Sequence, residues 1–235
     1  MIEALLCSVD EPQLDRCLES IRNQTVPFSN VVHINNVAPY CDAYNRGLSM
    51  LKDKWFMLLA GDMYLHPDAV EKVIMEIERE TDDRVIAHLH GVWDAFLQED
   101  SVGIGTFRTD ILKTTPFRNR LSCERYMGRK LDGNGWIFKR HESSPLGVHC
   151  DSPDEYQTFR RFYVMGVKFR GNVLDEIYGH VFDLFDETNN PLYSLAIKAM
   201  DFGRSNREYP GSHDINFEKK KWEEFSAISK EQSCS

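Results

Sequence analysis

The first 70 residues alternate short apolar strands with amphipathic helices, and this alternation restricts the fold more than any other feature of the sequence. Strands are predicted at 2–7, 31–34 and 55–59, and helices at 14–21, 40–51 and 67–80. Strands separated by helices of this length indicate a parallel sheet covered on both faces. Because ligands of such sheets lie beyond the carboxyl ends of the strands, the polar loops at 8–11, 35–37 and 61–64 are candidate binding segments.

The second half of the chain is less regular. Short strands are predicted at 85–91, 103–107 and 136–138, and helices at 109–115, 124–131 and 154–165. From residue 176 onward the chain is predicted to be helical with aromatic anchors, and to become disordered after Trp222. We therefore expect a binding and catalytic domain at 1–170, followed by a helical C-terminal extension at 171–235.

Charge and hydropathy exclude several classes of partner. The formal net charge is −9, whereas a protein that binds a nucleic-acid polymer usually has a basic face. A small anionic substrate neutralised by a divalent cation remains compatible with an acidic chain. The longest apolar run, 55–60, is too short to cross a bilayer, and the first residues lack the pattern of a signal peptide. We expect a soluble, cytoplasmic protein without an integral membrane segment.

The six cysteines show neither a C-x-x-C motif nor zinc-type spacing. Their even number is compatible with disulfides, but a chain of 235 residues does not need such cross-links. Free and mostly buried thiols in a reducing compartment are the preferred interpretation.

Several segments, taken in order, resemble family 2 GT-A glycosyltransferases. Residues 14–25 carry L-x-x-C-L-x-S-I-x-x-Q-T, residues 43–48 carry A-Y-N-R-G-L, and residues 59–68 carry L-A-G-D-M-Y-L-H-P-D. The last of these is similar to the region that contains the family's D-x-D motif. The strand that follows the first of these segments ends in Asn35-Asn36, where the family usually has two aspartates. The resemblance covers residues 3–170.

The resemblance implies an α/β protein of GT-A type, which is Rossmann-like. Its central sheet would be mixed and mostly parallel, with helices on both faces and a helical C-terminal appendage. It also implies an inverting glycosyltransferase that moves a sugar from a nucleotide-diphosphate donor to the hydroxyl of a glycan or other acceptor, with Mn²⁺ or Mg²⁺. The D-x-D motif is degenerate, because Ala60 stands where the family has its first carboxylate.

The resemblance places the metal at Asp62 and His149. A divalent cation on oxygen ligands can offset the charge that the diphosphate gains as the glycosidic bond breaks. Alternatively, Asp62 caps the loop before Pro67, and His149 is a structural histidine. The nucleotide would contact residues of the three strand-end loops, for which turn or helix-cap roles are the alternatives; these are Ser8, Asp10, Asn35, Asn36, Gly61 and Asp62.

Glu124 is the predicted general base, at a position where the family usually has aspartate. A carboxylate there would accept the proton of the acceptor hydroxyl. Alternatively, Glu124 is a solvated glutamate at a helix N-terminus, where the helix dipole favours it. Trp93 and Asp94 would contact the acceptor sugar by stacking and hydrogen bonding; a core role for Trp93 is the alternative.

Two alternative functions differ in how well the sequence fits them. A nucleotidyltransferase of similar topology usually has a glycine-rich, basic loop after its first strand, whereas residues 8–12 are acidic and lack glycine. A catalytically inactive relative that binds a nucleotide or a glycan is favoured by the loss of the carboxylate at Ala60.

Overall fold

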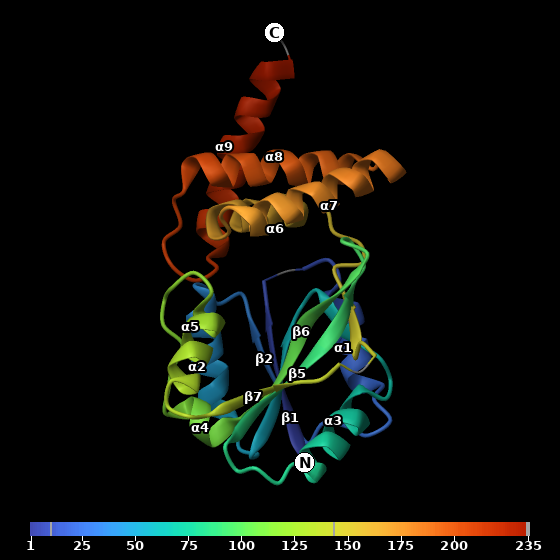
Figure 1. Ribbon diagram of the computed structural model, residues 1–235, viewed down its shortest axis with the longest axis vertical. Coiled ribbons are helices and arrows are strands. Elements are labelled where there is room, and N and C mark those ends of the chain that lie inside the picture. Colours follow the sequence, from blue (N-terminus) through green and yellow to red (C-terminus); the bar gives the residue numbers. More distant parts are fainter. Residues whose placement is uncertain (10, 143, 234–235) are drawn as a thin grey trace. The chain divides into compact units, whose positions relative to one another are not determined.

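The chain forms two compact units, Met1–Ser152 and Pro153–Ser235. The computed structural model describes residues 1–9, 11–142 and 144–233, with side chains up to residue 229 (Figure 1). The helix predicted at 154–165 therefore belongs to the second unit. The functional boundary predicted near residue 170 is not tested by this division and stays a prediction.

The first unit is built around a mixed sheet of eight described strands in the order β2-β1-β3-β6-β5-β8-β4, with β7 beside β5. Four of the seven pairings are parallel, and those of β3 with β6, β5 with β6 and β4 with β8 are antiparallel. The predicted mixed, mostly parallel sheet is confirmed. The strands are β1 Ile2–Ser8, β2 Val31–Asn35, β3 Trp55–Ala60, β4 Met63–Leu65, β5 Val85–Asp94, β6 Glu99–Arg108, β7 Ile137–Arg140 and β8 Gly147–His149.

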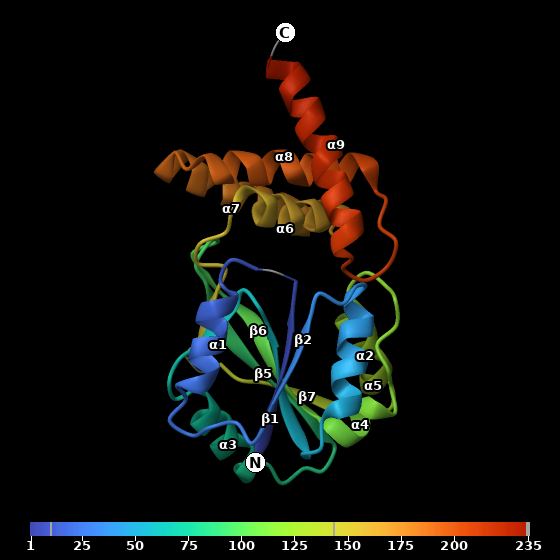
Figure 2. The same cartoon turned by 180° about the vertical axis from the view of Figure 1, so that it is seen from behind.

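Helices cover both faces of this sheet. On one face lie α1 (Leu14–Arg22) and α3 (Ala69–Arg79), and on the other lie α2 (Tyr40–Met50), α4 (Thr109–Lys113) and α5 (Cys123–Asp132) (Figures 1 and 2). All of β1 is buried, and its side chains alternate between the two faces. Ala4 and Leu6 therefore enter the core under α1 and α3, whereas Leu5 and Cys7 enter the core under α2.

The sequence missed one strand and shortened two others. Met63 and Tyr64 were expected in the polar loop at 61–64, but Met63–Leu65 forms β4, which pairs with β8 over three residues. β5 and β6 were expected at 85–91 and 103–107, but their hairpin continues to Asp94 and Glu99. Among the added residues, Val92 is buried in the core under α1 and α3, whereas Glu99 and Asp100 are exposed. Ladder pairs such as Trp93 with Asp100 extend the hairpin beyond the apolar pattern of the sequence.

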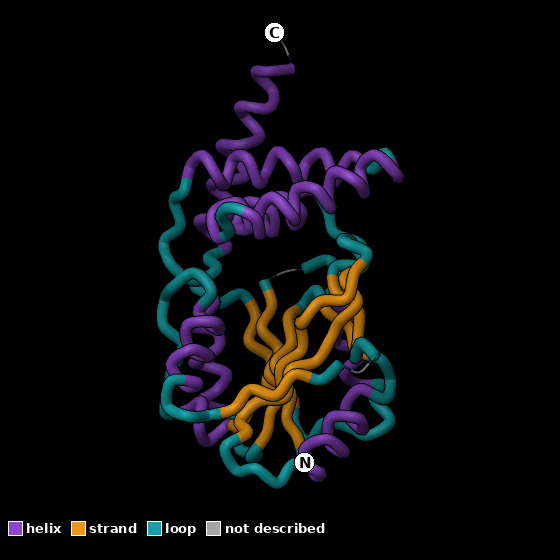
Figure 3. Tube along the Cα trace, viewed as in Figure 1, coloured by secondary structure: helices purple, strands orange, loops and turns teal. Residues whose placement is uncertain are grey.

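The second unit consists of helices, with no strand among its described residues (Figure 3). They are α6 Glu155–Lys168, α7 Asn172–Thr188, α8 Pro191–Asn206 and α9 Ile215–Ser233. Two glycines let α6 and α8 approach closely: a Cβ on Gly166 would lie 2.2 Å from the Met200 carbonyl oxygen, and one on Gly203 would lie 2.2 Å from that of Tyr163. α9 continues past Trp222 to Ser233, and the disorder predicted for the last residues stays a prediction.

Two predictions about chain chemistry can be compared with this fold. Cys7, Cys17, Cys41, Cys123 and Cys150 are free and buried, as expected, and Cys234 lies outside the described residues. No helix in the described part of the chain is both long and apolar enough to cross a membrane.

Candidate functional site

Polar residues gather where β1, β2 and β3 end side by side. The parallel register pairs Cys7 with Ala60 and Ser8 with Asn35, so the loops after all three strands begin at one edge of the sheet. Gly61 and Asp62 follow Ala60 directly. The sequence placed its binding loops at this edge, and the parallel pairing brings the strand ends together there.

At this edge, the imidazole of His149 lies between the carboxylates of Asp94 and Asp62. Nδ1 of His149 donates a hydrogen bond of 2.9 Å to Oδ2 of Asp94, and Nε2 of His149 lies 3.4 Å from Oδ2 of Asp62. The hydrogen bond to Asp94 requires a proton on Nδ1. When Nε2 carries no proton, its lone pair is directed toward Asp62, which is the arrangement in which a buried carboxylate orients a metal-binding histidine.

Strand pairing fixes the three side chains relative to one another. β8 runs parallel to β5 with Asp94 opposite His149, and antiparallel to β4 with Met63 opposite His149. The backbone N–H of Cys150 also donates to the Asp62 carbonyl at 3.0 Å. His149 is thereby held between the end of β5 and the turn that carries Asp62.

Asp94 is almost completely buried, with 1% of its surface exposed. Its Oδ1 accepts a 3.0 Å hydrogen bond from the Leu97 backbone N–H, and its Oδ2 accepts from His149. A buried carboxylate is stable only when its oxygens accept hydrogen bonds. The sequence predicted that Asp94 contacts an acceptor sugar; that role has not been tested, and the observed contacts give Asp94 a positioning role.

Glu11 contributes a carboxylate that the sequence did not single out. Its Oε2 accepts a 2.7 Å hydrogen bond from the Val9 N–H, and a Cβ added to Gly61 would lie 2.5 Å from that oxygen. The negative charges of Asp62 and Glu11 both add to the burial that raises the pKa of Cys17 to about 12. Glu11 therefore lies beside the Ala60-Gly61-Asp62 turn. An acidic residue in the loop after the first strand was the only signal in the sequence.

Ser8 and Asn35 form a hydrogen-bonded pair at the ends of β1 and β2. The Ser8 hydroxyl donates to Asn35 Oδ1 at 2.8 Å and lies 2.7 Å from His33 Nε2, a partner that the sequence did not predict. Asn36 has a positive φ of 55°, and its N–H donates to the Ser8 carbonyl at 2.9 Å. The predicted turn at Asn36 is present beside the binding candidates. Asp10 lies outside the described residues.

No family profile and no curated protein matches the sequence. By structure, the chain is similar to the mannosyltransferase PcManGT from Pyrobaculum calidifontis in complex with GDP-Man and Mn²⁺, with a TM-score of 0.54 and 10% identity over 89% of this chain and 76% of that chain. The chain has a GT-A-type fold. A structure of S. aureus TarS 1-349 in complex with UDP gives a TM-score of 0.49 at 10% identity, covering 86% and 81% of the two chains.

In this GT-A-type fold, Glu124 lies in the first turn of α5 and is partly buried. Burial raises the pKa of the Tyr40 and Tyr44 hydroxyls, and the charges of Glu124 and Cys7 raise these pKa values further. Glu124 therefore lies near Tyr40 and Tyr44 of α2, on the face of the sheet that α2 and α5 cover. No hydrogen bond joins Glu124 to Asp62 or His149 among the described residues.

Trp93 is the penultimate residue of β5 and is 40% exposed. It was expected beyond the fourth predicted strand, but it pairs with Val148 of β8 and Asp100 of β6. Side chains that follow one another in a strand point to opposite faces, so Trp93 and Asp94 diverge. An exposed indole is available for stacking, and its predicted contact with the acceptor stays a prediction.

Proposed function

We propose that the GT-A-type unit binds a nucleotide-diphosphate sugar through a divalent cation and transfers the sugar to a hydroxyl acceptor. The observation that carries this proposal is the Asp94–His149–Asp62 chain at the ligand-binding edge of the sheet. The relative PcManGT was solved in complex with GDP-Man and Mn²⁺, which suggests the same classes of donor and metal for this chain.

Asp62 and His149 are the proposed metal ligands. Two ligands of one Mg²⁺ or Mn²⁺ ion are usually about 3 Å apart, and the observed separation between Asp62 Oδ2 and His149 Nε2 is 3.4 Å. The ion, when bound, would neutralise charge that develops on the diphosphate leaving group. Mg²⁺ commonly keeps several waters and uses few protein ligands, so two side chains are a sufficient set.

Glu11 is proposed to supply negative charge that Ala60 no longer provides. Its carboxylate lies over Gly61, beside Asp62. A carboxylate at this place can bind a water of the metal shell or a ribose hydroxyl. Ser8, Asn35 and Asn36, on the neighbouring strand ends, are proposed to contact the base and ribose.

Glu124 is proposed as the general base of a single-displacement, inverting transfer. In this step the acceptor oxygen forms a bond to the anomeric carbon as the bond from that carbon to the diphosphate oxygen breaks. The acceptor proton passes to Glu124, and the nucleoside diphosphate leaves with the electron pair. The partly buried position of Glu124, close to Tyr40 and Tyr44 of α2, supports this assignment.

Calorimetry with UDP and GDP, each with and without Mn²⁺, tests the binding proposal. We expect binding that Mn²⁺ strengthens, and we expect Asp62→Asn and His149→Gln to weaken the metal-dependent part at least tenfold. Asp132→Asn, which neutralises an exposed aspartate at the end of α5, is the matched control and should bind like the unmodified protein. Metal-dependent binding that survives in both site variants would show that the metal is bound elsewhere.

A screen of nucleotide-sugars for hydrolysis or transfer then tests the activity. The second candidate function, an inactive GT-A-type module that binds a nucleotide or a glycan, is favoured by Ala60 at the first D-x-D position. Turnover of any donor that Glu124→Gln abolishes would support the enzyme. Failure to bind any nucleotide diphosphate would support the module.

A further inference from the structure

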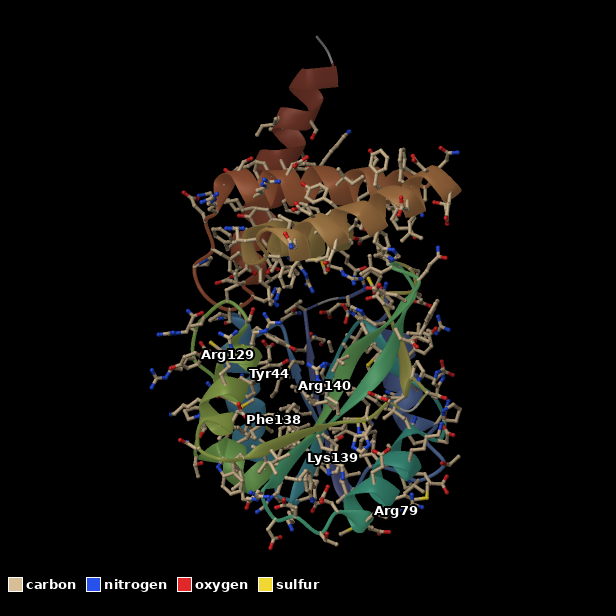
Figure 4. The ribbon with its side chains drawn as sticks, in the orientation of Figure 1. Tyr44, Arg79, Arg129, Phe138, Lys139 and Arg140 are labelled. Carbon is tan, nitrogen blue, oxygen red and sulfur yellow. The ribbon has the colours of Figure 1, made fainter. Side chains whose placement is uncertain are left out.

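A second group of titratable side chains lies on the face of the sheet that α3 covers. His88 and His90 share this face of β5, because strand residues two apart point to the same side, and both are 0% exposed. Glu76 comes from α3, and His141 follows the end of β7. These four residues are called the histidine cluster below. Arg79 at the end of α3 and Lys139 on β7, labelled in Figure 4, mark this side of the unit.

Three contacts of 2.9–3.4 Å link the four residues of the histidine cluster. Glu76 Oε2 lies 3.4 Å from His90 Nε2, and Glu76 Oε1 lies 3.3 Å from His141 Nδ1. On its other side, His141 Nε2 is hydrogen bonded to His88 Nδ1 at 2.9 Å. The Glu76 carboxylate thus faces one ring nitrogen of His90 and one of His141. The other ring nitrogen of His141 is hydrogen bonded to His88.

The cluster leaves buried polar atoms without hydrogen bonds. Within the described ranges, neither ring nitrogen of His90 makes a hydrogen bond, and the same is true of Nε2 of His88 and Oε2 of Glu76. Burying such groups without partners costs about 1–3 kcal/mol each in proteins. Apolar side chains would fill the same volume without this cost, so the arrangement needs a further binding partner.

We propose that Glu76, His90 and His141 bind a divalent transition-metal ion of the zinc class. Imidazole nitrogen and carboxylate oxygen are the ligand types that such ions combine. In a tetrahedral site with bonds of 2.0–2.1 Å, neighbouring ligand atoms are about 3.3 Å apart. Each histidine nitrogen lies close to this distance from one oxygen of Glu76, His90 Nε2 at 3.4 Å from Oε2 and His141 Nδ1 at 3.3 Å from Oε1. The ligand atoms of the three residues all lie within 4.8 Å of one another. With three protein ligands, the fourth position is left for water.

The rings must adjust when the ion binds. The rings of His90 and His141 are stacked, with centroids 4.7 Å apart and planes inclined by 12°, so their lone pairs lie in nearly parallel planes. His141 follows the end of β7 and is only partly buried. Rotation of His141 about its Cα–Cβ and Cβ–Cγ bonds would direct Nδ1 toward the ion, and the hydrogen bond to His88 restrains the position of Nε2. His88 is therefore a positioning residue for His141.

The local charges are compatible with a cation. Glu76 supplies one negative charge, and the nearby Lys139 is paired with Glu80 at 2.9 Å. The ion would join α3, β5 and the segment after β7, which are distant in the sequence. The proposed role is therefore structural: binding only the folded state stabilises that state in proportion to the ion's affinity and concentration.

This site is distinct from the one proposed for the nucleotide-sugar. His90 and Asp94 lie on the same strand, four residues apart, which corresponds to about 13 Å along β5. The zinc-class site does not depend on the proposed transfer activity, and its test needs no substrate.

The test is zinc uptake by the full chain after chelator treatment and dialysis. Zn²⁺ affinity is measured by competition with a chromogenic chelator, and Co²⁺ is used as a spectroscopic probe of four-coordinate nitrogen and oxygen ligands. We expect one site per chain that Glu76→Gln and His141→Asn weaken at least tenfold. We also expect zinc to raise the Tm of the unmodified protein but not that of these variants.

Two controls make the result specific. His66→Asn changes a histidine outside the cluster, and the double variant Asp62→Asn/His149→Gln removes the ligands proposed for the nucleotide-sugar site. Both should keep the zinc site and the rise in Tm. Zinc uptake that is lost in the double variant but kept in His141→Asn would overturn the proposal, as would an unmodified protein that binds no zinc. If Glu76→Gln fails to fold, His141→Asn, in the segment after β7, carries the test.

Discussion

Asp94 shows how one buried carboxylate can determine the chemistry of its neighbours. Both of its oxygens accept hydrogen bonds, one from the Leu97 N–H and one from His149 Nδ1. The second of these bonds decides which nitrogen of His149 faces Asp62. At the scale of single residues, the proposed metal site therefore depends on a residue that need not touch the metal.

The substitution Asp94→Asn tests this dependence. An amide has one acceptor oxygen, so it can serve either the Leu97 N–H or His149 Nδ1, but not both. We expect the Mn²⁺ concentration for half-maximal nucleotide binding to rise about 10- to 100-fold, the range for residues that orient metal ligands. Calorimetry at several Mn²⁺ concentrations measures it, with nucleotide affinity at saturating Mn²⁺ as the internal control. An unchanged Mn²⁺ requirement would argue against orientation by Asp94.

Glu124→Gln tests the proposed base. Glutamine keeps the size of the side chain but cannot accept the acceptor proton, so kcat should fall about 10²- to 10⁴-fold. The KM for the donor should change little, because binding the donor does not use this proton. Steady-state kinetics with the donor found by screening measure both constants. Glu155→Gln, in the first turn of α6, is the control, and equal kcat values in the two variants would exclude Glu124 as the base.

At the scale of elements, close approach of backbones determines which helices can pack together. Gly203 of α8 lies against the Tyr163 carbonyl of α6, and Gly166 of α6 lies against the Met200 carbonyl of α8. Glycine lowers the intrinsic stability of a helix. At these two positions, however, the lack of a side chain allows the two helix backbones to approach each other. The sequence contains these glycines, but it does not indicate which helix packs against each of them.

Gly203→Ala should destabilise the second unit. The new Cβ would lie 2.2 Å from a backbone oxygen that no rotamer change can move, and overpacking of this kind costs about 1–3 kcal/mol. The midpoint of urea unfolding, followed by circular dichroism, should fall accordingly. Gly179→Ala, in α7, is the control, because its Cβ would meet nothing within 4 Å. Equal loss of stability in both variants would contradict the packing argument.

At the scale of the whole molecule, each unit has its own buried polar groups that link stability to pH. In the second unit, Glu218 is 1% exposed. Burial alone raises the pKa of Glu218, but hydrogen bonding by His213 and the charge of Arg160 more than offset this, so its pKa lies below the ordinary value. The Tyr209 hydroxyl also donates to Glu218.

The second unit should therefore lose stability in acid. A carboxyl whose native pKa is depressed stabilises the fold above its unfolded pKa of about 4.3, and this contribution is lost as pH falls through the lower native pKa. Urea unfolding between pH 6 and pH 3 should show a loss that is smaller in Glu218→Gln, which should also be less stable at pH 6. Glu187→Gln, an exposed glutamate of α7, should behave like the unmodified protein. A pH dependence that is identical in Glu218→Gln would refute the assignment.

The local pattern of the sequence was sufficient for most of the first unit. The apolar alternation of β1, β2 and β3 and the periodicity of α1, α2 and α3 were predicted to within a few residues, because such patterns follow from burial on one face or on both. Their order predicted a parallel sheet covered on both faces, and the resemblance to GT-A glycosyltransferases implied that this sheet is mixed. The second unit was recognised only as helical, because aromatic spacing predicts helices but not the partner of each helix.

By itself, the sequence determined the order of strands and helices and the polar strand ends that include Asp62. Only the tertiary structure decided that His149 lies between Asp62 and Asp94, that Glu11 lies over Gly61, and that Glu76, His90 and His141 meet across α3, β5 and the segment after β7. These contacts depend on strand register and helix packing between residues far apart in the chain. Local periodicity carries no information about such distances, and for that reason the histidine cluster was not predicted.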